Sequence, residues 1–294
     1  MEHPFRLPTS VRLTKGPGGL ERFEISTPLS EAHVYLHGAH VEHFQAAGQA
    51  PLLFASSRSY HEAGRPIRGG VPIIFPWFSG SGPRPDAPAH GLVRTRLWNV
   101  RSVEEGDDGS VEFVFAFQPD EALAREWGGG WALEYRVHLS GRLRLSLTIR
   151  NTGEQPLACD DALHTYFAVS DVRNVELFGL EGKEYLTVIE DRPRKREGAA
   201  PIRFTGETDR IYLDAPGPCR IVDNNRVIHI EKEGARSTVV WNPWIAKSKT
   251  LADFDADEWP RLLCVETGNI AENRLLIPPG SAHTSVTTLW AEPL

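Results

Sequence analysis

Short segments in which apolar and polar residues alternate follow one another along almost the whole chain. Clear examples are Phe23–Ser26, Val111–Phe117 and Leu143–Ile149. A period of two is the pattern of a half-buried β-strand. Turn-forming groups separate the segments, among them Gly106–Gly109 and Asn151–Glu154. Many short strands at close spacing predict an all-β fold, a large antiparallel β-sandwich.

Helices are expected to be few and short. Asp120–Trp127 and Ser56–Glu62 each have the composition for one or two helical turns. Neither is long enough to supply the crossover helix of a parallel sheet. The chain shows no repeat of fixed period and no long linker. Because all-β folds often reach this length as one unit, we expect a single domain over residues 1–294.

The overall charge argues against large polyanions as partners. The 294 residues include 32 Lys and Arg against 39 Asp and Glu, a formal net charge of -7. A negative chain is repelled by nucleic acid and by anionic membranes, so neither is an expected partner. A small anionic ligand would have to be held by a local group of arginines.

The cysteines and the N-terminus bear on the cellular compartment. Cys159, Cys219 and Cys264 are odd in number and form no C-x-x-C pair, so neither a disulfide framework nor a structural zinc site is predicted. Met1–Arg6 has no apolar signal core, and no segment reaches the roughly 18 apolar residues of a membrane span. We expect a cytoplasmic protein, and a monomer because no assembly signal is visible.

One histidine stands out as a candidate acid or base. His164 lies in the β-forming segment Ala162–Phe167, after Asp160 and Asp161. An imidazole has an ordinary pKa near 6.5, so it exchanges a proton at neutral pH with little tuning. The structural alternative is a hydrogen-bonded histidine in the core.

A carboxylate forms the second candidate. Alternation in Leu262–Gly268 places Glu266 on the same face as Cys264 and Leu262. A carboxylate on an inward face is costly unless it is paired or takes part in chemistry. The alternative is that the strand ends here and leaves Glu266 exposed at the rim.

Two arginines are candidates for binding an anion or a sugar. Arg68 precedes Gly69–Gly70, and Arg94 follows His90–Gly91. Glycines allow the backbone to approach a ligand closely, and a guanidinium donates two hydrogen bonds to a phosphate group. No nucleotide-binding glycine motif is present. The alternative is a pair of surface arginines in salt bridges.

Other chemistries fit the sequence less well. His37–His43 contains four possible metal ligands, but a strand would split them between two faces, so no metal site is predicted. No G-x-S-x-G motif indicates a hydrolase. Asp209 and Glu266 could form the carboxylate pair of a glycosidase, yet that reading leaves the histidines and arginines without a role.

Taken together, these segments resemble the aldose 1-epimerase superfamily and, within it, the hexose-6-phosphate mutarotase branch. The resemblance spans nearly the whole chain. The matching motifs are Leu36–His40, Ile67–Phe78, His90–Gly91 with Arg94, Leu163–Phe167, Thr208–Tyr212, Val240–Trp244 and Val265–Thr267. One departure is Ala89, where relatives often carry Gln before the His-Gly pair.

The resemblance implies a galactose mutarotase-like β-sandwich with a few short helices, a sugar groove on one sheet, and no metal or organic cofactor. It also implies roles for six residues. His164 would be the general acid and Glu266 the general base. The substrate-binding positions would be Arg68, His90, Arg94 and Asp209. The expected reaction is α/β interconversion of glucose 6-phosphate or a related aldohexose 6-phosphate.

Two alternatives stay open at this point. The first is a mutarotase for free hexoses such as galactose. The second is a non-catalytic module that binds a sugar or sugar phosphate. Having both His164 and Glu266 argues against the binding module, although two residue types alone do not place their side chains together.

Overall fold

The alternating segments form β-strands, and every ladder between these strands is antiparallel. The structure, a computed structural model, describes residues 6–190 and 193–294. Val111–Phe117 is strand β7, while the other two segments lie in β2 (Glu21–Ser26) and β9 (Leu143–Asn151). In β9 every second residue is buried. The predicted all-β class is confirmed.

Two sheets of eight strands dominate the described ranges. The first sheet contains, in spatial order, β15 (Arg194–Arg196), β14 (Glu184–Thr187), β16 (Thr208–Tyr212), β19 (Ser237–Asn242), β20 (Leu262–Asn269), β11 (Asp161–Leu163) and β5 (Ile73–Ile74), with β12 (Tyr166–Ala168) also paired to β20. The second contains β13 (Glu176–Phe178), β17 (Cys219–Asp223), β18 (Arg226–Glu233), β22 (Ala282–Pro293), β9, β8 (Trp131–Leu139), β7 and β6 (Asn99–Glu105).

Smaller elements complete the fold. A four-stranded sheet is formed by β1 (Val11–Lys15), β2, β3 (Ser30–Tyr35) and β4 (Val41–Ala46), and a two-stranded one by β10 (Leu157–Cys159) and β21 (Leu275–Ile277). The helices are α1 (Glu121–Trp127), α2 (Trp244–Ser248) and the 3-10 turns η1 (Pro17–Gly19), η2 (Val93–Thr95), η3 (Val188–Glu190), η4 (Trp259–Arg261) and η5 (Ala271–Asn273).

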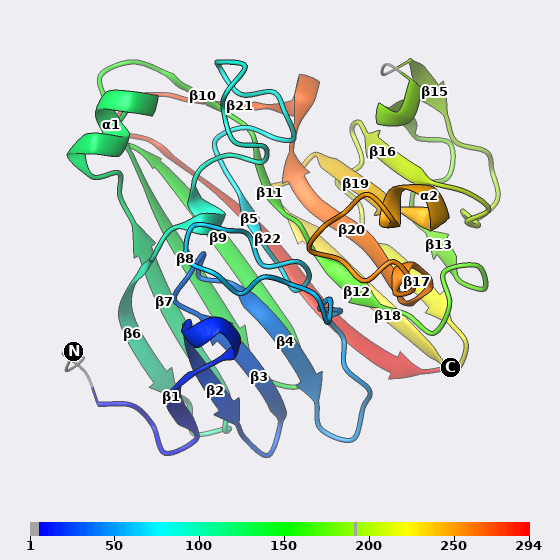
Figure 1. Cartoon of the computed structure of the whole chain (residues 1–294), viewed down its shortest axis with the longest axis horizontal. Coiled ribbons are helices and arrows are strands. Elements are labelled where there is room, and N and C mark those ends of the chain that lie inside the picture. The colour runs from blue at the N-terminus through cyan, green and yellow to red at the C-terminus, as the bar shows by residue number, and fades with distance from the viewer. Residues whose placement is uncertain (1–5, 191–192) are drawn as a thin grey trace.

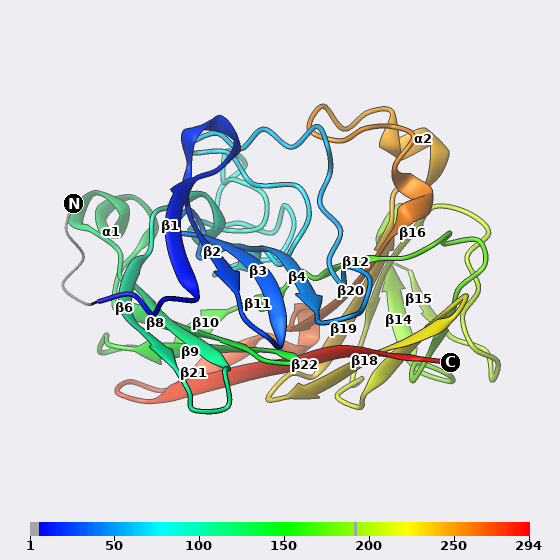
Figure 2. The same cartoon turned by 90° about the horizontal axis from the view of Figure 1, so that it is seen from below.

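The two large sheets pack face to face as the layers of a sandwich. Figure 2 shows β22 and β18 as the lower layer, with β20 and β19 above them and α2 on the far side. Thr267 of β20 donates a side-chain hydrogen bond to Thr287 of β22 at 3.3 Å, so one face of β20 meets the second sheet. The buried apolar cluster draws on both sheets and on the four-stranded one. The predicted antiparallel sandwich is confirmed.

The helices agree with the sequence in one case and differ in another. α1 follows the expected segment, and its N-cap Asp120 accepts a hydrogen bond from the Leu123 amide at 2.8 Å. The expected helix over Ser56–Glu62 is wrong. There the backbone bonds to a distant segment, since the Ser56 amide donates to the Arg68 carbonyl at 2.9 Å. No helix within the described ranges is long and apolar enough to cross a membrane.

A loop between β5 and η2 carries one candidate site residue. Gly91 forms a parallel bridge with Phe75 at the base of this loop, directly after His90. Gly91 has φ of +76°, and a Cβ there would lie 2.0 Å from the Phe75 carbonyl oxygen. Only glycine fits this position without moving the backbone.

Gly91→Ala is therefore expected to destabilise the protein by at least about 2 kcal/mol, because it adds both strain and a clash. Gly80→Ala is the matched control in the same loop, since a Cβ there meets nothing within 4 Å. Urea unfolding of both variants checks this. Equal stabilities for the two variants would contradict the reading of Gly91.

Candidate active site

His164 lies at a break between two short strands. β11 and β12 both pair with β20, with Leu163 opposite Thr267 and Tyr166 opposite Cys264. They act as one interrupted strand. The His164 amide leaves the ladder and donates to the Pro72 carbonyl at 3.0 Å. The imidazole of His164 points toward Glu266 of β20 and stacks on the ring of Tyr166 in β12, at 4.7 Å between ring centroids.

Glu266 projects from the middle of β20 toward this histidine. The residue is 1% exposed, which settles the earlier choice between an inward and a rim-exposed position in favour of the inward one. Its neighbour Thr267 faces the second sheet, so alternation turns Glu266 to the opposite face. The distance between Glu266 Oε1 and His164 Nε2 is 3.3 Å.

All six residues expected at the site line one cavity. Its volume is about 360 Å³, the size of a small-ligand pocket. It lies on the face of the first sheet that points away from β22. The lining includes Arg68, His90, Arg94, His164, Asp209 and Glu266. They come from the segments around β5 and η2, from the β11–β12 break and from strands β16 and β20.

Burial governs the protonation of the His–Glu pair. Desolvation, helped by nearby Asp209, raises the pKa of Glu266 well above 4.5. Desolvation, together with the charges of Arg94 and Arg68, lowers the pKa of His164 well below 6.5. Both shifts favour the uncharged forms of the two side chains, a protonated carboxyl group and a neutral imidazole.

Each member of the pair also presents an unused polar atom. His164 Nδ1 and Glu266 Oε2 are buried and have no hydrogen-bond partner among the described residues. A buried polar atom without a partner is costly, and a role in ligand binding or catalysis is one explanation for it. They are available to the hydroxyl or ring oxygen of a ligand.

His90 is held as a neutral hydrogen-bond donor. The Ser79 amide donates to His90 Nδ1 at 3.3 Å, so the neutral ring carries its proton on Nε2. Burial and the charge of Arg94 lower the pKa of His90 well below 6.5. The ring makes edge contacts with Phe78 and His164, at 4.9 and 5.5 Å between centroids.

The two arginines differ in whether an acidic side chain pairs with them. Arg68 donates to both carboxylate oxygens of Asp253, at 3.1 and 3.3 Å, and to the Tyr166 hydroxyl at 3.0 Å. Although burial opposes its charge, these two partners raise the pKa of Arg68. Burial lowers the pKa of Arg94 to about 10, so Arg94 stays charged at neutral pH.

Arg94 donates to the Ala89 carbonyl at 2.9 Å and forms no ion pair with any described residue. The contact at Ala89 is therefore with the backbone and does not depend on the side chain at that position. Of the two arginines, Arg94 is therefore the one whose guanidinium is available to bind an anion.

Sequence reasoning missed three residues of the site. Tyr166 follows His164 by two positions, and this spacing is the signal that could have identified it as a neighbour on the same face. Asp253 and Lys247 come from the segment between β19 and β20, where no periodic pattern marks them. Asp253 neutralises Arg68, and Lys247 lines the cavity.

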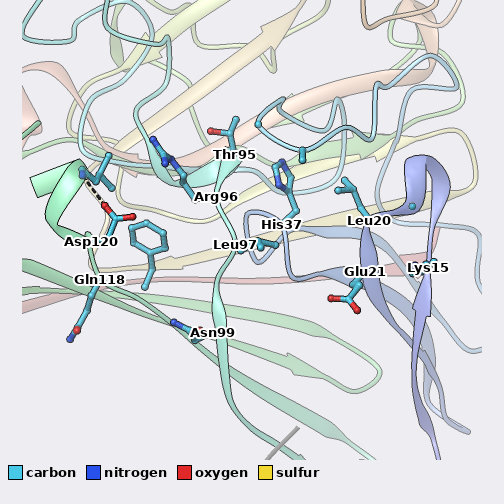
Figure 3. Close-up of a pocket in the computed structure, with 15 residues that line it drawn as sticks. Lys15, Leu20, Glu21, His37, Thr95, Arg96, Leu97, Asn99, Gln118 and Asp120 are labelled. Atoms are coloured by element: carbon cyan, nitrogen blue, oxygen red, sulfur yellow. Dashed lines mark hydrogen bonds between the residues drawn. The ribbon is translucent and has the colours of Figure 1, made fainter. Parts of the chain in front are cut away.

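A second cavity, of about 630 Å³, is larger than the first (Figure 3). Two of its polar lining groups, His37 and Asp120, are engaged in structural contacts. His37 bonds through Nε2 to the Arg65 carbonyl at 2.8 Å, and the Asp120 carboxylate caps α1. It contains no buried His–Glu pair among the described residues, so size alone does not identify the site. Nowhere in the described ranges do three or more His, Cys, Asp or Glu residues converge as a metal site.

The fold and this pocket define a class of isomerases, and sequence comparison agrees. A sequence profile described as aldose 1-epimerase matches residues 21–290. The chain therefore belongs to the aldose 1-epimerase family. A Cenchrus ciliaris protein named "putative glucose-6-phosphate 1-epimerase" is 33% identical, over 96% of this chain and 88% of that protein. An Escherichia coli protein of the same name is 30% identical, over 90% and 88%.

Solved structures give the same family. A mutarotase-like crystal structure from Salmonella typhimurium, named "putative mutarotase", superposes with a TM-score of 0.91 at 26% identity, covering 98% of this chain and 96% of that one. A galactose 1-epimerase from Lactobacillus acidophilus superposes with a TM-score of 0.70 at 13% identity, covering 96% and 98%. The second likeness concerns the fold alone.

Proposed function

We propose that the protein interconverts the α and β anomers of an aldohexose 6-phosphate, with glucose 6-phosphate as the first candidate. The observation that carries the proposal is a buried His–Glu pair, 3.3 Å apart, in one cavity with Arg94, which is charged and forms no ion pair with any described residue. The names of the curated relatives, 30–33% identical over most of the chain, support the phosphorylated substrate.

The proposed reaction needs two proton transfers and no covalent intermediate. Glu266 takes the proton of the anomeric hydroxyl while His164 donates one to the ring oxygen, and the ring opens to an aldehyde. Rotation about the C1–C2 bond presents the other carbonyl face. The same two groups, now in exchanged protonation states, close the ring on that face. His90, with its proton on Nε2, and Asp209 would bind sugar hydroxyls.

Phosphate binding gives a physical reason for the proton to reach His164. Burial, and after it the charges of Arg94 and Arg68, lower the pKa of His164, while burial raises the pKa of Glu266. A bound phosphate offsets those positive charges and so raises the pKa of His164. This shift favours the protonated imidazole, which is the form that donates to the ring oxygen of a closed sugar.

Arg94→Ala is expected to raise KM for glucose 6-phosphate roughly 10- to 100-fold, because a charge-assisted hydrogen bond to phosphate is worth about 1.5–3 kcal/mol. Exchange of free glucose should change little. Arg96→Ala is the matched control, since Arg96 is exposed and lines the other cavity. Equal effects of Arg94→Ala on both sugars would remove Arg94 from the phosphate site.

Magnetisation-exchange NMR tests the function itself. Equilibrated glucose 6-phosphate, free glucose and free galactose are compared with and without the protein. Faster exchange of the phosphorylated sugar alone supports the proposal. Faster exchange of the free sugars to the same extent supports a free-hexose mutarotase. Sugar-phosphate binding without exchange would identify a binding module.

We also propose that the protein acts in the cytoplasm as a monomer. Cys159, Cys219 and Cys264 are buried and not in disulfides, which suits a reducing compartment. The catalytic groups all come from one chain, so no second subunit is needed to complete the cavity. Cell fractionation and sedimentation equilibrium test these two points.

A further inference from the structure

A segment between β19 and β20 supplies part of the cavity wall. We call residues 243–258 the α2 arm. It begins with α2 and contributes Lys247 and Leu251 to the cavity that holds His164 and Glu266. Figures 1 and 2 show α2 beside β16 and β19, on the side of the molecule away from β22.

The base of the α2 arm is fixed by one asparagine and two tryptophans. Asn242 Nδ2 donates to the carbonyls of Trp259 and Leu262, each at 2.9 Å. Its Oδ1 accepts from the Trp244 amide at 2.8 Å. The Trp244 and Trp259 rings lie 4.4 Å apart between centroids. These contacts close the arm where it leaves and rejoins the sheet.

The remainder of the arm is tied to the opposite wall of the cavity. Asp253 forms its two-point ion pair with Arg68. Glu258, 5% exposed, accepts from the Ser56 hydroxyl at 2.7 Å and from the Ser57 amide at 3.2 Å. Because both ends are held, the backbone of Lys247 has a fixed place at the cavity.

The charges around the cavity are not balanced. Arg68 is neutralised by Asp253, whereas Lys247 and Arg94 form no ion pair with any described residue. Lys247 is exposed and Arg94 is partly buried, so one cation lies at the rim and the other deeper. A sugar phosphate carries about -1.5 to -2 charges at pH 7. Two cations that form no ion pair with a described residue supply charge of the opposite sign.

We propose that Lys247 is a second phosphate-binding cation and, with Arg94, sets the preference for phosphorylated over free sugars. The inference rests on the proposed function. It places the 6-phosphate toward the rim, between Lys247 and Arg94, while the anomeric end of the sugar lies at His164 and Glu266. The Asp209 carboxylate, which repels an anion, then faces sugar hydroxyls.

The test compares Lys247→Met with Lys249→Met. Met keeps the length of the side chain and removes the charge, and Lys249 is exposed on the same arm without lining the cavity. Lys247→Met is expected to raise KM for glucose 6-phosphate roughly tenfold, with kcat within about twofold, since one solvent-facing charge-assisted contact is lost. Exchange of free glucose should be unchanged, and Lys249→Met should match the wild type.

A binding measurement separates this inference from the proposed function. Inorganic phosphate is titrated calorimetrically into the wild type, both Met variants and Lys247→Arg. Weaker phosphate binding in Lys247→Met, retained in Lys247→Arg, supports Lys247 whether or not the wild type turns over glucose 6-phosphate. Unchanged phosphate binding and unchanged KM in Lys247→Met overturn it. A wild type that exchanges no sugar phosphate overturns the proposed function instead.

Discussion

Glu266→Gln is expected to lower kcat for anomer exchange by about 10²- to 10⁴-fold, because the amide cannot accept the anomeric proton. Gln has nearly the same shape, so the 3.3 Å approach to His164 and the shape of the cavity are retained. KM for glucose 6-phosphate should change far less than kcat, as the phosphate contacts remain. Magnetisation exchange at several sugar concentrations measures both constants. Turnover like the wild type would remove Glu266 from the reaction.

The stability of the same variant separates lost chemistry from lost folding. Burial raises the pKa of Glu266, so the folded protein binds this proton more tightly than the unfolded chain. The contribution of Glu266 is therefore most favourable below pH 4.5 and is lost as pH rises through the raised pKa. Gln does not ionise and so avoids this loss. The stability of Glu266→Gln relative to the wild type should therefore increase as the pH rises from 5 to 8.

Urea unfolding at these two pH values checks the sign. Glu121→Gln serves as the control, because the Glu121 side chain is 92% exposed on α1 and should alter neither exchange nor the pH slope. An inactive Glu266→Gln that is also less stable at pH 8 would indicate a structural role for the carboxylate.

Several strands and the inward face of β20 could be predicted from the alternation of apolar and polar residues, because this pattern depends only on neighbouring residues. It identified β7 and parts of β2 and β9, and it turned Glu266 inward with Cys264. The same pattern does not give distances between strands. The approach of His164 to Glu266 depends on β11 and β12 pairing with β20, which is a contact between segments about a hundred residues apart.

Sequence reasoning fell short where contacts between distant segments outweigh the local preference of a segment for helix or strand. Ser56–Glu62 has helical composition, yet its first residues bond to Glu258, 202 residues away from Ser56. The ion pair of Arg68 with Asp253, 185 residues away, could likewise not be predicted from the sequence, while the predicted contact of Arg68 with an anion or a sugar stays a prediction. No local pattern connects these positions. The residue whose charge is open, Arg94, becomes distinct from Arg68 only once the chain is folded.

His164→Ala is expected to reduce kcat by about 10²- to 10⁴-fold as well, because it removes the proposed proton donor to the ring oxygen. Free imidazole added to this variant should restore part of the exchange, since the substitution leaves room for it beside Tyr166. Rescue of this kind reports proton transfer, which a purely structural histidine would not show.

His37→Ala is the matched control for His164→Ala. His37 is also a buried histidine, but it bonds to the Arg65 carbonyl at the other cavity. Its loss should leave kcat near the wild-type value and respond to no added imidazole. If His164→Ala keeps full turnover, or if imidazole affects both variants alike, His164 is not the acid. The proton would then have to come from Glu266 or from water, and the direction of transfer within the pair would be reversed.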